Sequence, residues 1–117
     1  MNQSGSYKKS AGKPPKAPAR YTTEARRLWR DVVAGWTLDP PALALLDSAC
    51  RALMRVREAQ ATITNEGAFY HDRFKQPKQH HAVLTERDAK QTLLRNLRAL
   101  NLDLEPLHDR PGRPGGS

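Results

Sequence analysis

Hydrophobic residues recur at helical spacing through the middle of the chain, between Asp39 and Gly67. These residues fall mostly three or four positions apart, and they are Leu43, Leu46, Ala49, Cys50, Leu53, Val56 and Ile63. Asp39 is a suitable N-cap, Pro40 and Pro41 suit a first turn, and Gly67 can end a helix. The pattern therefore predicts one amphipathic helix of about 26 residues, about 39 Å long, against which the rest of the chain packs.

A first, shorter helix is predicted before it, starting at Thr22 or Thr23 and ending near Gly35. Glu24 lies in its first turn, where the helix dipole favours a negative charge. The expected buried stripe consists of Ala25, Leu28, Trp29, Val32 and Trp36. The two tryptophans are interpreted as core residues.

A last helix is predicted from about Ala82 to Leu100. Thr85 and Asp88 form a possible capping box, which would delay the regular part of the helix to Glu86. The expected apolar face consists of Val83, Leu84, Leu93, Leu94, Leu97 and Leu100. Asn101 suits a left-handed C-terminal cap.

The segment 67–82 shows no helical period and is interpreted as a connection. Phe69 and Phe74 are expected to tuck against the helices, while Tyr70, Lys75 and Lys78 are available to a partner. Outside the helices, residues 1–21 and 107–117 are rich in Pro, Gly, Ser, Lys or Arg, which predicts disorder. The predicted fold is an all-α protomer of three helices over residues 22–106, built as a helical hairpin on the long helix.

The positive charge is concentrated at one end of the chain. The formal net charge is +8, and the pI is about 10.2. Within residues 1–30 only Glu24 opposes a set of basic residues, which are Lys8, Lys9, Lys13, Lys16, Arg20, Arg26, Arg27 and Arg30. Such clustering is typical of nucleic-acid binding, with these residues as the DNA contacts; the alternative is a solubilising tail.

Several classes of function find no support in the sequence. It shows no glycine-rich phosphate loop, no nucleophile with a base at telling spacing, and no carboxylate cluster, so we expect no enzyme activity and no cofactor. His71, His80 and His81 lack the spacing of a zinc site and a cysteine partner, so no metal is expected. Cys50 is interpreted as a packing thiol. No apolar run approaches the roughly 18 residues of a membrane span, so no membrane partner is expected.

The order of these segments resembles the small terminase subunits of tailed bacteriophages. A Trp-bearing helix leads into WTLDPPALALLDSACRALMRVREA, a loop with Gly67 and a basic stretch follows, and KQHHAVLTERDAKQTLLRNLRALNLDLEP closes the pattern. Ala82 matches the family's alanine, and the closing segment is matched by Leu100, Asn101, Leu102 and Pro106. His81 stands where the family usually has proline, and Asn101 replaces its usual glycine. The resemblance covers roughly residues 25–106.

The resemblance implies a non-enzymatic protein that assembles into a ring-type homo-oligomer. Such a protein binds double-stranded viral DNA and delivers it to a large ATPase and nuclease subunit, in the cytoplasm of the infected bacterial host. Two alternatives stay open: a small helical DNA-binding regulator acting as monomer or dimer, and an adaptor that binds only protein. Should the N-terminal arm not bind DNA, the next candidates are Arg87, Arg95, Arg98, Lys75 and Lys78.

Overall fold

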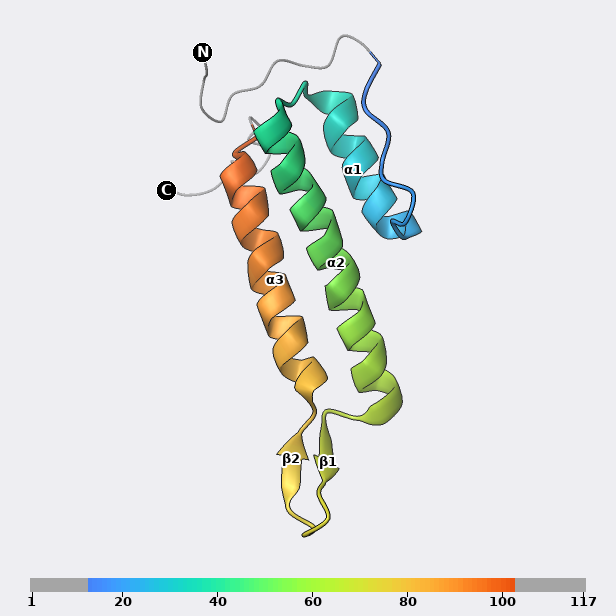
Figure 1. The fold of residues 1–117 in the computed structure, drawn as a ribbon, viewed down its shortest axis with the longest axis vertical. Coiled ribbons are helices and arrows are strands. Elements are labelled where there is room, and N and C mark those ends of the chain that lie inside the picture. Colours follow the sequence, from blue (N-terminus) through green and yellow to red (C-terminus); the bar gives the residue numbers. More distant parts are fainter. Residues whose placement is uncertain (1–12, 103–117) are drawn as a thin grey trace, which may run out of the picture.

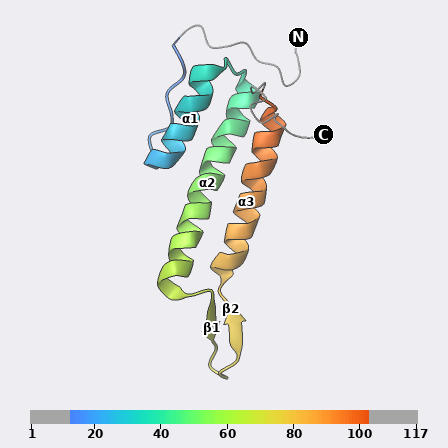
Figure 2. The same ribbon diagram turned by 180° about the vertical axis from the view of Figure 1, so that it is seen from behind.

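The computed structural model describes residues 13–102, which form three helices and one β-hairpin. In chain order the elements are α1 (Thr23–Gly35), α2 (Pro40–Glu66), β1 (Phe69–His71), β2 (Pro77–Gln79) and α3 (His81–Leu100). The antiparallel helices α2 and α3 lie side by side, α1 lies along the N-terminal half of α2, and the hairpin extends from the other end (Figures 1 and 2). The predicted three-helix arrangement on a long central helix is confirmed.

Both ends of α2 follow the chemistry that the sequence predicts. Asp39 accepts a hydrogen bond from the backbone N–H of Ala42 at 2.9 Å. At the other end Gly67, with φ of 87°, donates its N–H to the carbonyl of Ile63. The residues that α2 buries are mostly small, which lets neighbouring helices approach closely; they are Ala42, Leu46, Ala49, Cys50, Ala52, Val56 and Ala59.

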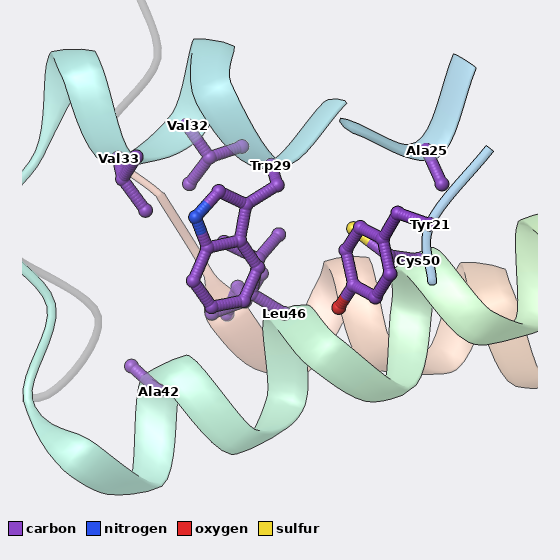
Figure 3. Packing of buried hydrophobic residues seen from close by; sticks show 9 residues of the cluster. Tyr21, Ala25, Trp29, Val32, Val33, Ala42, Leu46 and Cys50 are labelled. Atoms are coloured by element: carbon purple, nitrogen blue, oxygen red, sulfur yellow. The ribbon is translucent and has the colours of Figure 1, made fainter. Parts of the chain in front are cut away.

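The main core lies where all three helices meet, at the end opposite the hairpin (Figure 1), and Figure 3 shows its packing. It is built by Tyr21, Ala25, Trp29, Val32, Val33, Ala42, Leu46, Cys50 and Leu100. The rings of Tyr21 and Trp29 meet edge to face, with centroids 6.0 Å apart. Cys50 is fully buried, as its interpretation as a packing thiol requires.

The expected disorder through residue 21 is wrong for its last part. Residues 13–20 have no helix or strand, but the indole Nε1 of Trp29 donates to the carbonyl of Pro15 at 3.0 Å. Tyr21 is only 5% exposed, and its hydroxyl donates to Asp47 on α2. This segment therefore packs on the helices. Residues 1–12 and 103–117, with the predictions made for them, lie outside the described residues.

The predicted start of α3 near Ala82 is confirmed to within one residue, but the cap of this helix differs from the prediction. The helix begins at His81, and its N-cap is His80, whose Nδ1 accepts from the backbone N–H of Ala82 at 3.0 Å. The predicted capping box of Thr85 and Asp88 therefore lies inside the helix. The left-handed conformation of Asn101 after Leu100, with φ of 48°, is confirmed.

Two leucines assigned to the buried face of α3 are exposed. Leu84 is 45% and Leu94 is 52% exposed. The residues of α3 that are buried are Ala82, Ala89 and Leu100. Polar contacts between α3 and α2 set the pairing: Asn96 donates to Ser48 at 2.6 Å, and Gln60 donates to Glu86 at 2.9 Å.

The segment after Gly67 forms a short antiparallel hairpin, which the sequence did not predict. Phe69 pairs with Gln79, Tyr70 with Lys78, and His71 with Pro77. Phe69 and Phe74 do not tuck against the helices: they are 64% and 70% exposed. The hairpin instead projects both side chains away from the core.

Candidate nucleic-acid interface

The structure describes six of the eight predicted DNA-binding residues: Lys13, Lys16, Arg20, Arg26, Arg27 and Arg30. Lys8 and Lys9 lie outside the described residues. Three of the six converge, because segment 13–17 runs back along α1 and places Lys16 beside Arg26 and Arg30. We call the hollow between segment 13–17 and α1 the α1 groove.

The α1 groove has a volume of about 360 Å³ and combines an apolar floor with cationic walls. Its lining consists of Pro14, Pro15, Lys16, Ala17, Arg26, Trp29, Arg30 and Val33. The floor depends on Trp29, which is 6% exposed and whose indole N–H donates to the carbonyl of Pro15. The cationic side chains that line the groove can bind an anionic group of a ligand.

Arg26 is held in place by the same segment. Its Nη2 donates to the carbonyls of Ala19 at 3.3 Å and Tyr21 at 3.2 Å. These hydrogen bonds occupy some of the N–H donors of the Arg26 guanidinium group. Arg30, one helical turn later, is exposed. The groove therefore has one fixed cation and a second that is free to adjust toward a phosphate.

The charges of this surface are not neutralised by ion pairs. Among residues 13–102, ion pairs within 4.0 Å join Arg51 to Asp47, Arg57 to Glu24, His80 to Glu66 and Lys90 to Glu86. None of the six cations takes part in these pairs. The acid at the start of α1, Glu24, is engaged bidentately by Arg57, and this hydrogen bonding lowers the pKa of its carboxyl group.

The remaining three cations lie outside the α1 groove. Lys13 lines a neighbouring hollow of about 200 Å³ that also includes Trp36 and Leu43. Arg27 is exposed, is absent from the lining of the groove and acts electrostatically on Glu24. Arg20 is exposed in the turn before Tyr21. The predicted set is therefore one surface only in part, with Lys16, Arg26 and Arg30 as its convergent centre.

The hairpin carries a second basic surface, made by Arg73, Lys75 and Lys78, and the sequence analysis missed Arg73. Arg73 stands in the hairpin turn, with its guanidinium carbon 5.1 Å from the centre of the Phe74 ring. It accompanies Lys75 and Lys78, which the sequence analysis had noted. The run Arg73-Phe74-Lys75, an aromatic between two cations, was the available signal.

The described residues offer little to a metal. Within residues 13–102, no group of three His, Cys, Asp or Glu side chains is placed to hold an ion. His80 uses both ring nitrogens, one as the α3 cap and the other on Glu66 at 2.8 Å. Cys50 lies in the core, where burial raises the pKa of its thiol to about 11.

No helix within the described part of the chain is long and apolar enough to cross a membrane. Comparison with protein-family models, with curated proteins and with solved structures gave no match to this chain.

Proposed function

We propose that this chain is a non-enzymatic DNA-binding protein that serves a tailed bacteriophage as its small terminase subunit. In this role it binds double-stranded viral DNA in the cytoplasm of the infected bacterial host. It then delivers the DNA to a large ATPase and nuclease subunit. The observation that carries the DNA-binding part is the convergence of Lys16, Arg26 and Arg30 on one groove without ion-pair partners among residues 13–102. The terminase part rests on the family resemblance.

Unpaired cations on a built surface favour a polyanionic partner over a solubilising role. A solubilising tail needs only charge, whereas here Trp29 and Pro15 hold the backbone that carries Lys16 against α1. Holding a cation in place reduces the entropy lost when it binds a phosphate. Two backbone carbonyls likewise hold the Arg26 side chain in place, so it also loses less entropy when it binds a phosphate.

The arrangement of the helices supports self-association, as a ring requires. The helix α1 covers only one half of the α2–α3 pair (Figures 1 and 2). Leu84 and Leu94 expose apolar surface on α3 that the protomer leaves uncovered. Burying such surface between copies is favourable.

Binding of a fluorescent duplex, measured by anisotropy at several salt concentrations, tests the DNA-binding role. The double variant Lys16→Gln/Arg30→Gln removes two groove cations whose side chains are exposed. If both contact phosphates, the slope of log affinity against log salt should fall in magnitude by about 2. The matched control Lys90→Gln removes an exposed cation that already pairs with Glu86, and it should keep the wild-type slope.

The same titration separates this function from its competitors. Equal slopes for the groove variant and wild type would exclude the α1 groove as the DNA contact. The contact would then move to Arg87, Arg95 and Arg98 on α3, or to Lys75 and Lys78 in the hairpin. Absence of salt-dependent binding altogether would favour the adaptor that binds only protein. A non-enzymatic role further predicts no DNA cleavage and no nucleotide hydrolysis by the purified protein with Mg²⁺.

A further inference from the structure

The β1–β2 hairpin, residues 69–79, is far more elaborate than the connection that two antiparallel helices need. Helix pairs in bundles are usually joined by about two to eight residues, whereas α2 ends at Glu66 and α3 begins at His81. The hairpin projects past both helices, at the end of α2 remote from α1 (Figure 1). It contributes nothing to the main core.

The hairpin exposes aromatic side chains that the protomer does not bury. Five large hydrophobic residues are exposed within residues 13–102, and three of them belong to the hairpin. These are Phe69, Tyr70 and Phe74, at 64%, 50% and 70% exposure. An exposed phenyl ring forgoes the favourable transfer out of water that burial gives. Such a cluster marks an interaction surface.

The turn of the hairpin holds its tip in a defined shape. The Asp72 carboxylate accepts from the backbone N–H groups of Phe74 at 2.8 Å and Gln76 at 3.0 Å. Backbone hydrogen bonds join Lys75 N–H to Asp72 C=O at 2.8 Å, and Asp72 N–H to Gln76 C=O at 3.0 Å. Lys75 adopts a left-handed conformation, with φ of 63°. The exposure of Phe74 is therefore fixed by the turn.

The tip is also basic. Arg73 and Lys75 flank Phe74, and Lys78 lies opposite Tyr70 on the neighbouring strand. The single acid, Asp72, directs its carboxylate oxygen at the backbone of the turn. Cations that alternate with aromatic rings suit a polyanion whose units also carry flat apolar surface, which describes nucleic acid.

Charge decides between DNA and a second copy as the occupant. Three cations, Arg73, Lys75 and Lys78, stand against the single acid Asp72 in the hairpin, so the hairpin of a second copy would present like charge to the tip. Duplex DNA presents one negative charge per about 1.7 Å of its axis. Its major groove, about 12 Å wide, admits a two-stranded ribbon.

We propose that the β1–β2 hairpin is a second DNA-contacting element. Arg73, Lys75 and Lys78 contact phosphates of the duplex, and Phe74 lies against base edges in the groove between them. This inference rests on the proposed DNA-binding function. It adds a contact that reaches the bases, at the other end of α2 from the α1 groove.

Duplex binding by the full-length chain, measured by anisotropy across a salt series, tests the hairpin. Lys75→Gln/Lys78→Gln should lower the magnitude of the salt slope by about 2, because two phosphate contacts are lost. Phe74→Ala should weaken binding roughly tenfold at every salt concentration without changing the slope. Thr64→Ala, a truncation at an exposed position of α2 outside the hairpin, should change neither. All these side chains are exposed, so melting curves should stay unchanged.

A photoreactive residue reports the contact directly. Phe74→p-benzoylphenylalanine should crosslink to the duplex, whereas the same residue in place of Ala44, which is exposed on α2, should not. Hairpin variants that bind as wild type, while Lys16→Gln/Arg30→Gln weakens binding, would overturn the inference and leave the proposed function standing. Variants that alter only the native mass would overturn it in favour of a contact between copies. Failure of the wild-type chain to bind duplex would overturn both proposals.

Discussion

Replacing Tyr21 with phenylalanine tests whether segment 13–21 is anchored to the helices by a side-chain hydrogen bond. The Tyr21 hydroxyl donates to Asp47 on α2, which also accepts from the Arg51 Nε at 3.0 and 3.1 Å. Tyr21 is 5% exposed, and the same variant keeps its ring against Trp29. The substitution therefore removes one hydrogen bond and little else.

The expected cost follows from the surroundings of Asp47. A hydrogen bond to a charged group contributes about 1.5–3 kcal/mol. Asp47 keeps Arg51 and its side chain is 35% exposed, so water can replace part of the loss. We expect the free energy of unfolding to fall by about 1 kcal/mol, which for a domain of this size lowers Tm by about 4–8 °C. Tyr21→Ala, which also removes the buried ring, should cost about 3–5 kcal/mol.

The pH dependence of Tyr21→Phe gives a second readout. Burial raises the pKa of Asp47, but the hydrogen bonds from Tyr21 and Arg51 outweigh it, and the net shift is downward. The stability that the lowered pKa contributes is present above about pH 3.9, the unfolded value, and is lost as pH falls through the folded value. The gap between wild type and Tyr21→Phe should therefore narrow in acid.

Urea unfolding followed by circular dichroism at pH 7 and in a series down to pH 3 measures both effects. Tyr70→Phe is the matched control, because Tyr70 is 50% exposed on the hairpin, and it should leave stability unchanged. Equal stability of Tyr21→Phe and wild type at pH 7 would refute the anchoring role. A gap that stays constant through the acid range in which Asp47 becomes protonated would refute the assignment of the partner as Asp47.

Three further substitutions or reactions test particular contacts. His80→Ala should destabilise by about 1 kcal/mol through loss of the α3 cap, whereas His80→Asn keeps a side-chain acceptor and should recover most of it; thermal melts compare them. Cys50 should react with a thiol reagent at pH 8 only after denaturation, because burial raises the pKa of its thiol to about 11, and rapid labelling of the native protein would contradict this. Gly67→Ala should cost about 1–3 kcal/mol because φ is 87°, while Gly35→Ala, with no neighbouring atom within 4 Å of its Cβ, should be neutral or stabilising.

The helices were predictable because their signals are local. Asp39, Gly67 and Asn101 act at helix ends through bonds to residues a few positions away. The cap of α3 was not predictable, since His80 is an uncommon capping residue whose second ring nitrogen binds Glu66 across the connection. The order of segment 13–21 likewise depends on Trp29 and Asp47, which no local pattern reveals.

The hairpin escaped prediction for a different reason. Each strand has only three residues, and all are exposed, so there is no alternation of buried and exposed positions to detect. Its shape depends on the Asp72 turn. For the candidate site, the sequence located the positive charge, but the convergence of Lys16 with Arg26 and Arg30 required the path of the backbone.

Native mass spectrometry of the full-length chain mixed with a short duplex tests the central claim most directly, because it reports stoichiometry and DNA binding together. The account predicts that the protein forms a closed homo-oligomer larger than a tetramer. It predicts two species in the mixture, the free oligomer and the oligomer with one bound duplex. A monomer or dimer carrying DNA would contradict the terminase role and favour a regulator. An assembly that binds no duplex at low salt would contradict the DNA-binding function itself.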